Sequence, residues 1–123
     1  MVCGQRLYTT SISGFLRSLA SKSYANMVRL ILGAKTPDTE AGYKFFRRKA
    51  ILPILEAVKE KGWFWDTEVV IRTEKSGLKV ASIPVVFRRR RDKTSTVNLA
   101  KDTFDYIVKL QKFQRELSKE KSR

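Results

Sequence analysis

The stretch DTEAGYKFFRR, from Asp38 to Arg48, is the segment around which the other predicted elements are arranged. It follows Pro37, and Pro-Asp is a typical opening of a turn. Gly42 gives the backbone conformational freedom in the middle of the stretch. Residues 42–46 then predict a short strand. The stretch therefore predicts a turn and a strand, followed by two basic residues before the next helix.

Upstream of this stretch, residues 14–33 predict a basic amphipathic helix. Its apolar and small side chains recur at spacings of three and four residues, which is the period of a helix (Leu16, Leu19, Ala20, Ser23, Met27, Leu30 and Ile31). Gly33 stands where the helix would end, and Arg17, Lys22 and Arg29 lie on the other face. Such a helix covers either a globular core or an anionic membrane surface. Residues 1–12 show no clear periodicity and are expected to be a frayed start.

Downstream, two further helices are expected. The first starts near Leu52, because Pro53 fits only in a first turn, and it ends at Gly62. The segment GWFWDTE follows, and its two tryptophans, Trp63 and Trp65, are interpreted as packing residues.

The second of these helices runs to Ser76, with Gly77 directly after its end. Asp66 is expected to be its N-cap residue, and Glu68 lies in the first turn, where the helix dipole favours an acid.

The best strand is Leu78–Phe87, which is rich in β-branched residues. Pro84 indicates that this strand lies at the edge of a sheet or carries a bulge. A last helix is predicted over Leu99–Leu117, and residues 118–123 are expected to be a disordered tail. Helices and strands thus alternate in a single α/β domain, whose two or three short strands make a poor sheet by themselves.

Composition limits the chemistry that the chain can perform. It has 26 Lys and Arg against 12 Asp and Glu, a formal charge of +14 that attracts polyanions such as nucleic acid, anionic lipid or phosphorylated small molecules. It has no histidine and one cysteine, Cys3, which excludes histidine-based triads and imidazole-ligated zinc. No apolar run approaches the roughly 20 residues needed to span a bilayer.

Four sequence elements occur in a characteristic order. Their residues are Arg29 and Gly33; Asp38, Gly42, Tyr43, Lys44, Phe46, Arg47 and Arg48; Gly62, Trp63, Trp65, Asp66 and Glu68; and Ile83, Pro84, Val85, the arginines 88–91 and Ser95. In this order and spacing they resemble the C-terminal half of family-2 glycosyltransferases, in particular the dolichyl- or polyprenyl-phosphate mannose and glucose synthases.

The resemblance implies a fold and a set of functional residues. The fold would be the C-terminal portion of a GT-A-type domain, with an incomplete central sheet flanked by helices. Asp38 would be the catalytic residue, acting as a positioning or charge-stabilising group near the sugar. Gly42 would let the backbone approach the substrate. The substrate and phosphate contacts would come from Arg29, Lys44, Arg88, Arg89, Arg91 and Ser95.

The resemblance also implies partners: a nucleotide sugar, a polyprenyl or dolichyl phosphate, and the cytoplasmic side of a membrane, where the protein would be peripheral. An acceptor phosphate is already ionised, so its attack on the sugar needs no histidine base. The complete enzyme would use a divalent cation, Mg²⁺ or Mn²⁺, whose ligands are not in this chain, because no Asp-x-Asp motif is present.

We therefore expect the chain to lack a donor-binding N-terminal half, which another chain could carry, and to be inactive without it. Two alternatives remain open from the residues alone. A non-enzymatic nucleic-acid-binding module would account for the charge and the four arginines, although no known binding motif is present. A membrane-surface adaptor without chemistry would account for the helix over residues 14–33.

Overall fold

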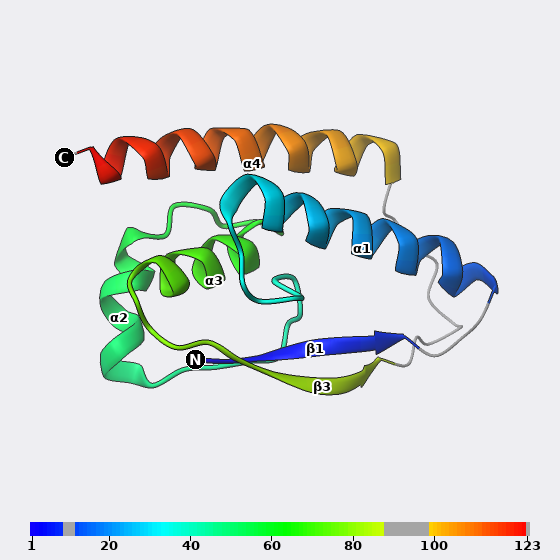
Figure 1. The fold of residues 1–123 in the computed structure, drawn as a ribbon, viewed down its shortest axis with the longest axis horizontal. Helices are drawn as coiled ribbons and strands as arrows, with labels where there is room; N and C mark the ends of the chain where they lie inside the picture. The colour runs from blue at the N-terminus through cyan, green and yellow to red at the C-terminus, as the bar shows by residue number, and fades with distance from the viewer. Residues whose placement is uncertain (9–11, 88–98, 123) are drawn as a thin grey trace. The chain divides into compact units, whose positions relative to one another are not determined.

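A computed structural model describes residues 1–8, 12–87 and 99–122. The chain divides into two compact units, Met1–Phe87 and Arg88–Arg123 (Figure 1). The first unit carries strands β1 (Val2–Tyr8), β2 (Lys44–Phe45) and β3 (Ala81–Phe87), and helices α1 (Ile12–Leu32), α2 (Arg48–Ala57) and α3 (Trp65–Lys75). In the second unit, helix α4 (Leu99–Lys121) is the described element. The chain is thus mixed α/β, as predicted.

The first unit is built on a three-stranded sheet with the strand order β2-β1-β3. β1 pairs antiparallel with β2 at Val2↔Phe45 and Cys3↔Lys44. It pairs in parallel with β3 along seven residues, from Val2↔Ala81 to Tyr8↔Phe87. The expectation of a frayed start is therefore wrong for residues 2–8, because β1 is the central strand, and residues 9–11 lie outside the described residues. The sequence of β1 does not alternate between apolar and polar residues. Its place in the sheet is set by pairing with β2 and β3, which lie far from it in the sequence.

Helix α1 confirms the predicted upstream helix and begins two residues before Gly14. Gly33 ends it with a φ of +70°, a left-handed conformation that favours glycine, and its N–H donates to the Arg29 carbonyl at 3.0 Å. The Tyr24 hydroxyl lies 3.0 Å from the Thr67 hydroxyl, so α1 is tied to α3.

Helix α2 begins at Arg48, four residues before the predicted start at Leu52, and it ends at Ala57 rather than Gly62. The prediction that Pro53 occupies the first turn is wrong, because Pro53 lies inside this helix. Packing of an apolar face offsets the missing hydrogen bond: Ile51 and Ile54 are buried together with Val69 of α3.

Helix α3 starts at Trp65, and its N-cap position is taken by Phe64, which makes no side-chain cap. The prediction of Asp66 as the N-cap is therefore wrong, because its carboxylate pairs with Lys44 instead. The end is close to prediction: α3 stops at Lys75, and Gly77 adopts a φ of +80°. Trp65 packs against the buried cluster, but Trp63 is 81% exposed, so its interpretation as a packing residue is wrong.

β3 lies at an edge of the described sheet, which confirms the position predicted from Pro84, and it starts at Ala81 rather than Leu78. Its side chains are little covered, with Ile83 43% and Val86 70% exposed. Helix α4 continues past Leu117 to Lys121, so most of the segment expected to be a disordered tail is helical. No helix breaker occurs there, and lysines in a last turn suit the helix dipole.

Candidate functional site

Asp38, the predicted catalytic residue, is held by Arg6 of β1. The guanidinium donates from Nε to Oδ2 at 2.8 Å and from Nη2 to Oδ1 at 2.9 Å. The Arg6 main-chain N–H also donates to Oδ2, at 3.1 Å. A two-pronged guanidinium–carboxylate pair fixes orientation as well as distance. The pair therefore presents the Asp38 carboxylate in one orientation beside the sheet.

The same pair determines the charge of Asp38. Burial raises the pKa of this carboxyl, but the hydrogen bonds and positive charge of Arg6 more than offset it, so the pKa lies below its ordinary value. Glu40 adds a second carboxylate near the same guanidinium, with Oε2 3.4 Å from Arg6 Nη2. Asp38 is consequently an anion that is poorly suited to take up a proton near neutral pH.

The loop that carries Asp38 is fastened to helix α3 on both sides of the aspartate. Before it, the Glu74 carboxylate accepts the main-chain N–H groups of Lys35 at 2.9 Å and Thr36 at 2.7 Å. After it, the Thr39 hydroxyl lies 3.0 Å from the Thr67 hydroxyl. Helix α3 therefore holds the loop in place on both sides of Asp38.

Lys44, predicted to contact phosphate, points into the protein. Its side chain is 3% exposed, and Nζ donates to Asp66 Oδ1 at 2.6 Å and to the Ala41 carbonyl. The contact brings together two sequence elements that lie 22 residues apart. Lys44 can meet a phosphate only if it leaves Asp66, so its contact in this structure is structural.

Glu68 is also engaged within the protein. Its side chain is 1% exposed and accepts Arg72 Nε at 2.7 Å and the main-chain N–H of Glu60 at 3.0 Å. The bond from Glu60 attaches the loop after α2 to the first turn of α3, and the bond from Arg72 lies within the helix. Glu68 lies in the first turn of α3, as predicted, but its side chain bonds to Arg72 and to the preceding loop.

The other predicted site residues are distributed more widely. Arg29 is exposed in the last turn of α1. Gly42 is exposed in the loop after Asp38, and a Cβ added there would meet nothing within 4 Å. The protein's own packing therefore does not require a glycine at this position. Arg88, Arg89, Arg91 and Ser95 lie outside the described residues.

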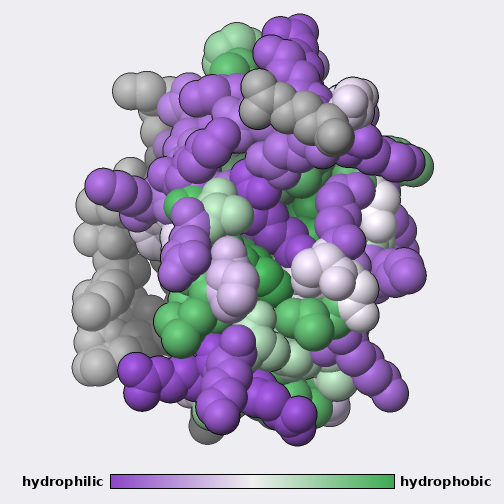
Figure 2. Space-filling view, turned by 90° about the vertical axis from the view of Figure 1, so that its left-hand side faces the viewer, coloured by the Kyte–Doolittle hydropathy of each residue, from purple (hydrophilic) through white to green (hydrophobic). Residues whose placement is uncertain are grey.

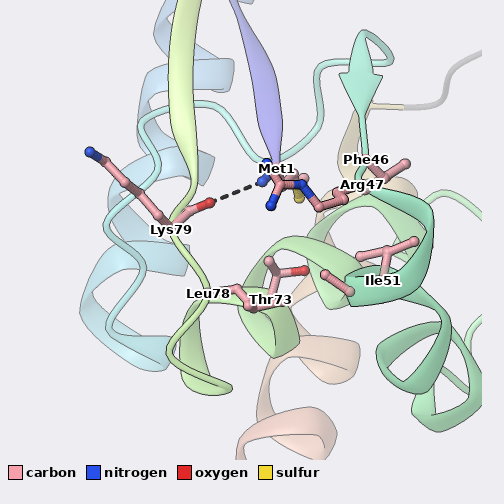
Figure 3. A pocket seen from close by; sticks show the side chains of 8 residues that line it. Met1, Phe46, Arg47, Ile51, Thr73, Leu78 and Lys79 are labelled. Atoms are coloured by element: carbon pink, nitrogen blue, oxygen red, sulfur yellow. Dashed lines mark hydrogen bonds between the residues drawn. The ribbon is translucent and has the colours of Figure 1, made fainter.

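A pocket of about 270 Å³ lies where β1 begins (Figure 3). Its lining combines apolar residues with two cations, Arg47 and Lys79, and includes Met1, Phe46, Ile51 and Leu78. The Met1 amino group donates to the Lys79 carbonyl at 3.0 Å. On the side of the molecule shown in Figure 2, apolar residues gather in one area of the surface. Asp38 does not line this pocket, so the pocket and the Asp38 site are separate features.

Within residues 1–8, 12–87 and 99–122, no group of three or more Cys, Asp or Glu side chains is placed to hold a metal ion. None of the helices described is long and apolar enough to cross a membrane.

Sequence reasoning missed the residues that hold the site, above all Arg6, Glu74 and Thr67. Arg6 lies in the segment that was expected to be frayed. Glu74 and Thr67 are polar residues of a helix, and nothing in the sequence indicates that they bond to the loop that carries Asp38. The available signal was the charge of Arg6, and a charge by itself does not indicate a partner.

Comparison with known proteins gives a consistent result. No family profile matches the chain, and no solved structure matches it. The chain is 35% identical to glycosyltransferase AglD of Haloferax volcanii over 86 residues, which is 70% of this chain and 14% of that protein. It is 32% identical to the polyprenol monophosphomannose synthase of Mycolicibacterium smegmatis over 75 residues, 60% of this chain and 28% of the relative.

A third relative is the dolichyl-phosphate beta-glucosyltransferase of Saccharomyces cerevisiae, 35% identical over 48 residues, or 39% of this chain and 14% of the relative. The chain thus spans between 14% and 28% of the length of these proteins. The resemblance inferred from the motifs is confirmed: over part of its length this chain is homologous to glycosyltransferases, among them enzymes named for polyprenyl and dolichyl phosphates.

Proposed function

We propose that this chain is the C-terminal, acceptor-side part of a GT-A-type glycosyltransferase that transfers a hexose from a nucleotide sugar to a polyprenyl or dolichyl phosphate. The observation that carries the proposal is the similarity over 60% of this chain to a polyprenol monophosphomannose synthase and over 39% to a dolichyl-phosphate glucosyltransferase, together with that over 70% to a glycosyltransferase. The alternative of a nucleic-acid-binding module is not favoured, since these relatives are sugar transferases.

The geometry around Asp38 supports this chemistry. An acceptor phosphate attacks as an anion and needs no base, and Asp38 is held as an anion rather than as a proton acceptor. A fixed negative charge stabilises the positive charge that develops on the sugar during transfer. In this proposal Gly42 admits the substrate to the loop beside Asp38, and Arg29, Arg88, Arg89, Arg91 and Ser95 contact phosphates. Lys44 also contacts a phosphate if the phosphate replaces Asp66 as the partner of its ammonium group.

We propose further that a donor-binding half completes the sheet, from the same polypeptide or another chain. Parallel strands are normally covered on both faces, whereas β3 pairs in parallel with β1 and remains largely exposed. The divalent cation, Mg²⁺ or Mn²⁺, would be bound in that half. Three acidic side chains of the motifs instead form ion pairs within this chain: Asp38 with Arg6, Asp66 with Lys44 and Glu68 with Arg72.

Membrane association is part of the same proposal, because the acceptor is a lipid. The protein would lie peripherally on the cytoplasmic side of a membrane. Helix α1 supports it with exposed basic residues, Lys22 and Arg29, beside exposed leucines, Leu19 at 53% and Leu30 at 86%. Cations and exposed apolar side chains on one helix are the composition that binds anionic bilayers.

The test is a transfer assay on anionic liposomes that contain polyprenyl phosphate, with radiolabelled nucleotide sugars. We expect no transfer by the purified chain alone. We expect transfer when the donor-binding half of the Haloferax relative is added or fused. Transfer by the chain alone would contradict the need for that half, and no transfer by the assembly with any nucleotide hexose would refute the function. Flotation of the chain with the same liposomes reports membrane binding separately.

A further inference from the structure

We propose that Arg6 is the positioning residue for Asp38 in the transfer reaction. This role rests on the proposed function, since it assumes that Asp38 lies beside the sugar. The structure supplies a direct contact between the two side chains, at 2.8 Å and 2.9 Å, and both are largely buried, with 21% and 13% of the side chains exposed.

The geometry distinguishes this pair from an ordinary surface ion pair. Three donors of a single residue reach the two carboxylate oxygens: Nε, Nη2 and the main-chain N–H of Arg6. The main-chain donor belongs to β1, whose place is fixed by pairing with β3 along its whole length. Asp38 is therefore attached to the most constrained strand of the unit, and its carboxylate can turn only if Arg6 moves.

Lysine could not do the same. An ammonium group is a point charge without a planar pair of donors, so it neutralises a carboxylate but does not fix its plane. Glutamine would keep one donor and remove the charge. The series Arg6→Lys and Arg6→Gln therefore separates the effect of charge from the effect of orientation.

The rest of the loop is held independently of Arg6. Glu74 holds Thr36 on one side of Asp38, and Thr67 holds Thr39 on the other. Loss of the Arg6 side chain should then leave the path of the loop intact while the carboxylate rotates and becomes easier to protonate. A displacement of about 1 Å at a reacting group costs on the order of 100-fold in rate.

The experiment uses the active assembly of chain and donor-binding half, with Arg6→Lys, Arg6→Gln, Asp38→Asn and the double variant Arg6→Gln/Asp38→Asn. Arg115→Gln, an exposed arginine of α4, is the matched control. We expect Arg6→Gln to lower kcat by about 100-fold with little change in KM, and to move the acid limb of the pH profile to higher pH. Arg6→Lys should recover part of kcat, and the double variant should be no slower than Asp38→Asn alone.

A second readout does not need transfer. Carboxyl ¹³C NMR of this chain should show Asp38 titrating at higher pH in Arg6→Gln than in the wild type, and circular dichroism checks that each variant is folded. If Asp38→Asn lowers kcat while Arg6→Gln leaves kcat and the pH profile unchanged, the positioning role is overturned and the proposed function stands. If Arg6→Gln does not fold, wild-type kcat in Arg6→Lys overturns the role, and reduced kcat supports it. A wild-type assembly without any transfer overturns both.

Discussion

Replacing Lys44 with methionine separates a structural role of this lysine from a phosphate-binding role. Lys44→Met keeps an unbranched side chain in the same buried space and removes the charge and the donors. The lost contacts are the 2.6 Å bond to Asp66 and the bond to the Ala41 carbonyl, which belongs to a residue 1% exposed. If the lysine is structural, the main effect of the substitution is on the free energy of unfolding.

The size of that effect follows from the two bonds. A hydrogen bond between charged groups contributes about 1.5–3 kcal/mol, and a buried carbonyl left without its donor costs about 1–3 kcal/mol. The Asp66 side chain is 27% exposed and can be rehydrated, which lowers the sum. We expect a loss of about 2–3 kcal/mol, a large share of the stability of a small domain.

Urea unfolding followed by tryptophan fluorescence measures this loss, expected as a fall in the midpoint of about 1–2 M. Lys49→Met is the matched control, because Lys49 is exposed in α2, and it should stay within about 0.5 kcal/mol of the wild type. A double-mutant cycle with Asp66→Asn should give a coupling energy of about 1 kcal/mol or more. If the unfolding free energy of Lys44→Met is as close to that of the wild type as that of Lys49→Met, the reasoning is refuted. Lys44 would then again be a candidate for contacting phosphate.

Two further predictions concern stability. Because the pKa of Asp38 lies below its ordinary value, its pair with Arg6 stabilises the fold above the unfolded pKa of about 3.9, and this contribution is lost as the pH falls through the folded pKa. Urea midpoints between pH 6 and pH 2 should therefore fall more steeply for the wild type than for Arg6→Gln, and parallel curves would contradict this. Gly33→Ala should cost about 1–2 kcal/mol, since Gly33 has a φ of +70°, whereas Gly42→Ala should be neutral within about 0.5 kcal/mol. Thermal unfolding of the two alanine variants checks the difference, and equal losses would show that the two glycines are constrained alike.

The sequence by itself determined the elements whose signals are local. The helix period upstream of Gly33, the glycines that end α1 and α3, and the edge position of Pro84 all depend on neighbouring residues and on backbone geometry. The absence of histidine and the ordered motifs were likewise readable directly, and they led to the glycosyltransferase resemblance that the relatives confirm.

Only the tertiary structure decided which polar residues meet. β1 carries no strand pattern strong enough to be recognised, because its pairing partners come from positions 44–45 and 81–87. Asp66 has the spacing of a helix cap but pairs with Lys44, and Asp38, predicted from its motif to be catalytic, is held by Arg6. The strength of an ion pair depends on distance and burial, and residues 22 or 32 positions apart acquire both only when the chain has folded.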